Sequence, residues 1–219
     1  MATLKQKRST DQKTSTDGVS KRKNFSGFNL KEAFKQLKLR EIQPWEEQPA
    51  PAVASDFFRE RLARLQRHFD LETCEESKKL LIDAVCEEAL EGFDNIKVWK
   101  GANLESPTTS GVADYLIAER KGYLEAPFLC IIEAKKDDFE QGLAQCLVEM
   151  QACQWENQQV DRTIETLGIV SNGNAWAFYR LTIAGEVYKT ELYALTDLGM
   201  VLGWLKHVFQ RCETNLAAG

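Results

Sequence analysis

Gly111-Val-Ala-Asp114-Tyr-Leu-Ile and Ile131-Ile-Glu133-Ala-Lys135 are the two stretches that decide the fold of this chain. They belong to apolar runs over 112–118 and 127–134 that are typical of β-strands, and residues 119–126 between them are polar or turn-forming. The pattern predicts an antiparallel hairpin with a long loop. Folding the hairpin about residues 123 and 124 sets Asp114 opposite Glu133. Opposed residues share one face with Cβ atoms about 5 Å apart, and Lys135 joins that face two residues further on.

The three charged side chains on this face favour a functional site. Two neighbouring carboxylates repel each other unless a cation lies between them, and Mg²⁺ accepts carboxylate oxygens while it keeps several waters. A lysine beside the metal can orient a water molecule or stabilise charge on a phosphate. The alternative is an exposed Glu–Lys pair at a strand end with an unrelated aspartate. The inward apolar neighbours favour the functional interpretation; they are Val112, Leu116, Leu129 and Ile131.

An aspartate, a gap of eighteen residues and then Glu-x-Lys at the end of an apolar strand resembles the PD-(D/E)xK nuclease superfamily. Gly-Val-Ala-Asp-Tyr-Leu-Ile followed by Ile-Ile-Glu-Ala-Lys-Lys is similar to the nuclease domains of type I restriction subunits. The resemblance covers about residues 73–182, and Ala113 stands where the pattern has a proline. It implies a restriction-endonuclease-like α/β/α sandwich and metal-dependent hydrolysis of DNA phosphodiesters. A fold alone does not fix an activity.

The resemblance also implies roles for individual residues. Asp114 and Glu133 would hold Mg²⁺ or Mn²⁺, and Lys135 would position the attacking water. The family places a further acid on the helix before the hairpin. Among the candidates on that helix, Glu75 lies in line with the buried stripe of Ile82 and Cys86, whereas Glu76 and Glu87 lie on the polar side. Glu75 is therefore the candidate for a second metal contact, or else it only favours the positive end of its helix.

A glutamine on the helix after Glu-x-Lys is the other supporting group that the resemblance implies. Gln145 occupies that place, where it would steady Lys135 or a phosphate, unless it is simply exposed. Glu149 and the pair Asp137-Asp138 are expected to be solvated or to cap the helix. Tyr115, Trp176 and Tyr179 are able to stack on bases, but we expect core packing for all three.

The charge of the chain is unevenly distributed. Residues 1–40 hold eleven Lys or Arg and three acidic residues, which gives +8, and since the whole chain carries −5, residues 41–219 carry −13. A basic tail can attract phosphate backbones, or it can be a solvated leader. An acidic body argues against broad coating of nucleic acid. Basic candidates near the site are Lys97, Lys100, Arg120, Lys121 and Lys136.

The order of expected elements predicts one core domain over 51–219 after a basic, largely disordered tail over 1–50 that contains a short helix at 29–39. Helices are expected over 55–68, 73–93, 138–156 and 198–212. Strands are expected over 96–100, 112–118, 128–134, 166–171, 175–181 and 186–193. Helices mixed with hairpin strands in this order indicate an α/β class with a mixed central sheet flanked by helices.

The sequence lacks an apolar run of membrane-spanning length and a secretory signal, so a cytoplasmic protein is expected. The six cysteines form no Cys-x-x-Cys pair and indicate buried thiols in a reducing compartment. The best hypothesis is a Mg²⁺- or Mn²⁺-dependent nuclease with DNA as its partner. The alternative is a non-catalytic nucleic-acid-binding or scaffold module that keeps the same fold. The oligomeric state is left open, a homodimer included.

Overall fold

A mixed β-sheet lies at the centre of the computed structural model, which describes residues 22–135 and 137–218. Within these residues the sheet has nine strands in the order β1-β4-β5-β6-β7-β8-β2, with β3 on β4 and β9 on β7. Their bounds are β1 Lys23–Asn24, β2 Gln43–Pro44, β3 Ile96–Glu105, β4 Thr109–Glu119, β5 Phe128–Ala134, β6 Thr166–Ser171, β7 Ala175–Leu181, β8 Val187–Lys189 and β9 Tyr193–Ala194. Strands β5 and β6 run parallel, whereas β3, β4 and β5 are antiparallel neighbours. The predicted mixed α/β class is therefore confirmed.

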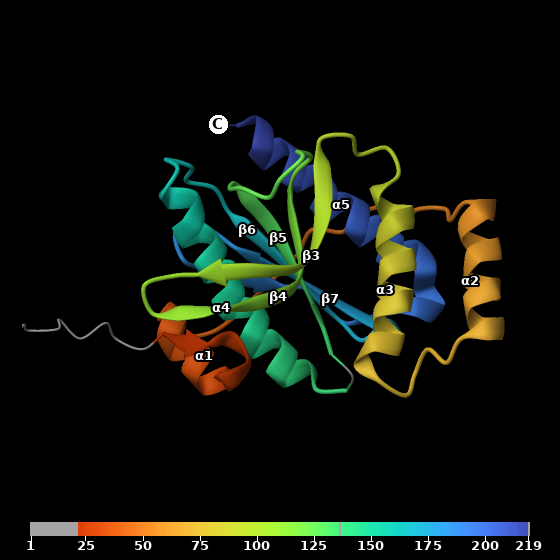
Figure 1. The fold of residues 1–219 in the computed structure, drawn as a ribbon, viewed down its shortest axis with the longest axis horizontal. Helices are drawn as coiled ribbons and strands as arrows, with labels where there is room; N and C mark the ends of the chain where they lie inside the picture. The colour runs from red at the N-terminus through yellow and green to blue at the C-terminus, as the bar shows by residue number, and fades with distance from the viewer. Residues whose placement is uncertain (1–21, 136, 219) are drawn as a thin grey trace, which may run out of the picture.

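Helices cover both faces of this sheet. They are α1 Leu30–Leu37, α2 Asp56–His68, α3 Glu75–Leu90, α4 Phe139–Gln158 and α5 Leu198–Ala217, with two short 3-10 turns at Phe25–Gly27 and Leu195–Asp197. Figure 1 shows α1 and α4 on one side of the sheet, and α2, α3 and α5 on the other. Each side has its own apolar core: Trp204 of α5 belongs to one and Leu147 of α4 to the other.

The helix starts follow from capping side chains that the sequence supplies. Ser55 accepts a hydrogen bond from the backbone N–H of Phe58 at the start of α2, and Asp138 accepts one from Gln141 at the start of α4. At α1, Asn29 and Glu32 form a reciprocal capping box. These caps place the start of α4 directly after the Glu133–Lys135 stretch.

The predicted domain boundary near residue 50 needs correction. Residues 22–27, which were expected to be disordered, form β1 and a short 3-10 turn; residues 1–21 lie outside the described part of the chain. Phe25 is buried over Gly111, where an added Cβ would lie 2.6 Å from the Phe25 ring. The segment after α1 pairs β2 with β8 and buries Trp45 against Trp204. Single buried aromatic residues, Phe25 and Trp45, anchor these two segments in the core, although the average composition of both segments is polar.

Two further expectations about strands differ from the structure. The strand expected over 186–193 is split into β8 and β9. At the break, the Thr190 hydroxyl, and not a backbone carbonyl, accepts the hydrogen bond from the backbone N–H of Phe178. Strand β3 continues to Glu105, five residues beyond its expected end. The tight hairpin predicted at Asn172-Gly173 is confirmed, with Gly173 at φ +83° between β6 and β7.

Two remaining features concern the hydropathy of the helices and the exposure of the cysteines. Among the helices that the structure describes, none is long and apolar enough to cross a membrane. The six cysteines are free thiols; Cys74 is exposed and the other five are buried. The expectation of buried cysteines therefore holds for all but Cys74.

Candidate active site

The register of the β4–β5 hairpin brings the predicted residues together. Tyr115 pairs with Ile132 and Leu116 with Ile131, so the same register sets Asp114 opposite Glu133, as predicted. The register depends on an irregularity between Ile117 and Ala118, because Ala118 pairs with Phe128. Without that bulge, Asp114 would fall opposite Ile132 and its side chain would face away from the site. The bulge is thus what aligns the two carboxylates.

Asp114 is fixed at the end of this hairpin by contacts to both of its oxygens. Its Oδ2 accepts a hydrogen bond of 3.0 Å from the backbone N–H of Ala134, which ties β4 to β5. Its Oδ1 lies 2.9 Å from the Lys79 ammonium of α3. The apolar surroundings are as expected at Leu116, which is buried, but Val112 is 54% exposed and does not line the site.

Glu133 is fully buried next to Lys135. The Lys135 Nζ lies 2.7 Å from the Glu133 Oε1, within ion-pair distance but outside hydrogen-bond geometry. Among the described residues, the Oε2 of Glu133 has no hydrogen-bond partner. Burial and, to a smaller extent, the charge of Asp114 raise the pKa of Glu133 to about 7, although Lys135 acts in the opposite direction. A buried carboxylate with open lone pairs is suited to binding a cation.

The helix α3 supplies an acid and a lysine to the same place. Glu75 is the first residue of α3, and its Oε1 lies 3.2 Å from Lys79 Nζ one turn later. Burial acts to lower the pKa of Lys79, but ion pairs with Asp114, Glu76 and Glu75 outweigh it and raise the pKa above its ordinary value. Glu75 was predicted from the sequence as a site residue, whereas Lys79 was not. The i,i+4 spacing from Glu75 was the signal that could have found it.

Gln145 lies against Lys135, as the sequence predicts for a supporting residue. Its Oε1 accepts a hydrogen bond of 3.1 Å from the Lys135 ammonium. Its Nε2 donates one of 3.1 Å to the Glu149 Oε1, one helical turn further along α4. Gly142 lets α4 approach this closely, because an added Cβ there would lie 2.9 Å from Lys135 Cγ. The amide of Gln145 is therefore held with its carbonyl toward the lysine.

The expectation that Glu149 is a solvated group is wrong. Its side chain is 0% exposed, and burial together with the charge of Glu133 raises its pKa well above the ordinary range. The error arose because α4 is covered on both sides, by the sheet and by α1, so a polar residue between two apolar stripes is still enclosed. Asp138 does cap α4, and Asp137 is exposed and lies 3.4 Å from the Lys78 ammonium.

The basic residues expected near the site are engaged elsewhere. Lys100 pairs with Asp83 at 2.8 Å, and Lys121 pairs with Glu119 and Glu125. Arg120 donates to the Phe93 carbonyl, and Lys97 lies over the Trp99 ring. Lys136 lies outside the described residues. The aromatic candidates Tyr115, Trp176 and Tyr179 are all buried, so core packing is confirmed for them.

The residues present offer a limited set of ligands for a divalent metal. Among residues 22–135 and 137–218, no three His, Cys, Asp or Glu side chains are grouped as a ready-made metal site. The buried Oε2 of Glu133 has no hydrogen-bond partner, and Asp114 lies opposite, so the two carboxylates offer oxygens of the kind that a hard cation accepts. The predicted metal set of Asp114, Glu133 and Glu75 is thus not preassembled in the described residues, and its role in holding a metal stays a prediction.

Comparison with known proteins adds no identity to this geometry. No protein family model matches the chain, and no curated protein or solved structure matches it.

Replacing Glu133 with glutamine is expected to flatten part of the pH dependence of stability. The folded-state pKa of about 7 lies above the unfolded value of 4.5, so between these values the folded chain keeps a proton that the unfolded chain has lost. The stability that this carboxyl contributes is present below pH 4.5 and is lost as the pH rises through about 7, by about 3 kcal/mol in all. Urea unfolding across this range measures the effect.

The exposed Glu72→Gln variant is the matched control and should keep the pH dependence of the unaltered chain. Identical slopes for Glu133→Gln and the unaltered chain would show that Glu133 is not the group responsible. Glu149 remains in both variants, but the charge of Glu133 helps to raise its pKa, so Glu133→Gln also lowers the pKa of Glu149 and the flattening reports on both carboxyls.

Proposed function

We propose that this chain is a metal-dependent nuclease that hydrolyses DNA phosphodiester bonds. The observation that carries the proposal is the convergence of Asp114, Glu133 and Lys135 at the ends of two paired strands, where the Lys135 ammonium lies beside Glu133 Oε1 and the buried Oε2 has no hydrogen-bond partner among the described residues. Placing a second carboxylate, that of the partly exposed Asp114, opposite the buried Glu133 is unfavourable for a purely structural pair. The resemblance to the PD-(D/E)xK pattern supports the same activity.

The proposed roles follow from the contacts of each side chain. Asp114 and Glu133 hold Mg²⁺ or Mn²⁺, and Glu75 contributes a further carboxylate from α3. When bound, the metal polarises the phosphate and lowers the pKa of water. Lys135 orients the attacking water and stabilises charge on the phosphate. Gln145 holds the Lys135 ammonium in place through the 3.1 Å hydrogen bond.

Glu149 contributes to the proposed site as a positioning residue. Because it accepts from the Gln145 amide nitrogen, it determines which end of the amide faces Lys135. A flipped amide would present N–H groups to the ammonium and repel it. A continuous polar chain thus runs inside the protein from Glu149 through Gln145 and Lys135 to Glu133.

Lys79 favours a second candidate function, that of a non-catalytic nucleic-acid-binding or scaffold module. Its ammonium lies 2.9 Å from Asp114 and 3.2 Å from Glu75, so it balances both acids without a metal. For the nuclease function, a metal that binds Asp114 has to compete with this lysine. Calorimetric titration with Mn²⁺ separates the two functions, because a scaffold of this kind would take up no metal.

Purified protein is expected to cleave DNA in the presence of Mn²⁺ and to lose this activity on addition of a chelator. Incubation with plasmid and with linear DNA, followed by electrophoresis, measures the cleavage and separates endonuclease from exonuclease action. The Asp114→Asn variant removes one metal-binding charge at constant size and should be inactive. Cleavage that persists with chelator, or in Asp114→Asn, would reject the proposed function.

A further inference from the structure

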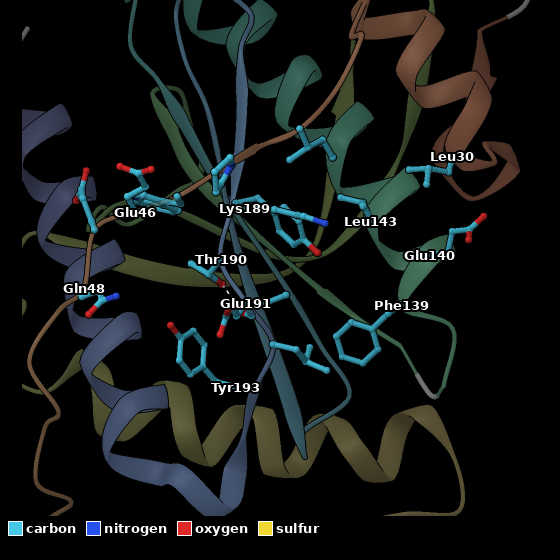
Figure 2. A pocket seen from close by; sticks show the side chains of 17 residues that line it. Leu30, Glu46, Gln48, Phe139, Glu140, Leu143, Lys189, Thr190, Glu191 and Tyr193 are labelled. Atoms are coloured by element: carbon cyan, nitrogen blue, oxygen red, sulfur yellow. Dashed lines mark hydrogen bonds between the residues drawn. The ribbon is translucent and has the colours of Figure 1, made fainter.

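A groove of about 830 Å³ lies beside the proposed site, on the same face of the sheet. Across the sheet Glu133 of β5 pairs with Val170 of β6, and Val170 pairs with Ala177 of β7, which lines the groove. Two strand spacings, about 10 Å, therefore separate Glu133 from the groove wall. Figure 2 shows the groove between the start of α4, where Phe139 and Leu143 project into it, and the segment that carries Glu46.

The groove combines an apolar floor with an acidic rim. Phe139, Leu143, Tyr179 and Tyr193 contribute apolar surface. Three glutamates are exposed along it, with Glu46 and Glu140 at opposite sides in Figure 2 and Glu191 between them. None of the three takes part in an ion pair within the described parts of the chain.

Two other charged residues line the groove, and only one of them offsets part of this negative charge. Glu47 forms ion pairs with His207 and Arg211, so it does not add to the unpaired negative charge of the rim. Lys189 is the one basic residue among the described lining residues. The rim therefore carries excess negative charge, which disfavours phosphate groups and favours a cationic ligand with an apolar part.

The chain itself contains a segment with this chemistry. Leu4-Lys5-Gln6-Lys7-Arg8 combines three positive charges with one branched apolar side chain. Over residues 1–21, five basic and two acidic residues give a net charge of +3. We propose that residues 4–8 dock in the groove of their own chain, with Leu4 on the apolar floor and the basic side chains along Glu46, Glu140 and Glu191.

The connecting chain is long enough for this contact. Leu30 at the start of α1 lines the groove, and it is eight residues from Arg22, where the described chain begins, so at most about 29 Å separate the two. The fourteen residues from Arg8 to Arg22 can span about 46 Å when extended. A tether of this length gives the segment a local concentration of about 1 mM at the groove, so a weak contact is sufficient.

Disulfide trapping in the full-length chain tests the proposal. In a Cys74→Ser background, which removes the exposed thiol, Leu4→Cys is combined with Leu192→Cys at the groove. The matched control combines Leu4→Cys with Phe57→Cys, an equally exposed apolar position in a hollow lined by Arg61 and Arg64. With glutathione disulfide as the oxidant, we expect the groove pair to close within one molecule about tenfold faster than the control.

A second variant tests whether the glutamates of the acidic rim attract the basic segment. Glu46→Gln, Glu140→Gln and Glu191→Gln together should slow closure of the groove pair about tenfold, because three exposed charge contacts are lost. A chain with Glu72→Gln, Glu91→Gln and Asp94→Asn has the same net charge and should close at the original rate. Equal rates for the groove and control pairs, no effect of the groove glutamines, or disulfides formed mainly between molecules would each overturn the proposal.

Discussion

Replacing Lys135 with alanine is expected to lower metal-dependent DNA cleavage by about a thousandfold or more, because a positioned acid–base or charge-stabilising group contributes about that much. The ammonium is the only charge within ion-pair distance of Glu133 among the described residues. Its loss also removes an influence that lowers the pKa of Glu133, so more of that carboxyl is protonated near neutral pH. Single-turnover cleavage with Mn²⁺ measures the loss.

Lys121→Ala is the matched control for this experiment. Like Lys135, Lys121 forms ion pairs with glutamate, in its case with Glu119 and Glu125. It lies near the loop end of the same hairpin, away from Asp114. Its removal should leave cleavage unchanged, and both variants should show the circular dichroism of the unaltered chain. Unchanged cleavage by a folded Lys135→Ala variant would refute the role of this lysine.

Replacing Trp204 with alanine is expected to lower the free energy of unfolding by about 3–5 kcal/mol, the usual cost of emptying a large buried aromatic site. Trp204 is 1% exposed; its ring stacks on Phe178 with centroids 5.5 Å apart and meets Trp45 edge-on at 5.1 Å. Removing it therefore takes away the support of the segment that carries β2. Urea denaturation measures the change in stability.

A local measurement separates loss of this support from general destabilisation. The backbone N–H of Trp45 donates to the Lys189 carbonyl at 2.7 Å, and its hydrogen exchange should accelerate in Trp204→Ala. Phe57→Ala is the control, since Phe57 is 66% exposed and its truncation should change stability by less than about 0.5 kcal/mol. A loss of under about 1 kcal/mol in Trp204→Ala would contradict the central position of this residue.

The sequence predicts the hairpin and its charged residues because strand geometry is local and has a period of two. Asp114, Glu133 and Lys135 fall on the shared face by counting alone. The count gives the correct register only because of the bulge between Ile117 and Ala118, and no pattern in the sequence predicts that bulge. The assignment of β5 and of the helix starts at Ser55 and Asp138 rests on equally local signals.

The parts that the sequence did not predict depend on contacts between distant segments. Lys79 and Glu149 join the site because α3 and α4 are enclosed on more than one side, which weakens the amphipathic pattern that separates inside from outside. The burial of Phe25 and Trp45 requires partners at Gly111 and Trp204, far along the chain. Composition averaged over a window records the polar neighbours and misses such single aromatic anchors.

The pairing of β2 with β8, and of Trp45 with Trp204, sets an order for assembly during synthesis. Residues 43–45 leave the ribosome well before the strand and helix that receive them. The contact between Trp45 and Trp204 can form only after α5 has emerged, and contacts of such long sequence separation form slowly. Until β2 pairs with it, the edge strand β8 is unpaired. The nascent chain therefore passes through a stage in which chaperone binding or self-association competes with folding.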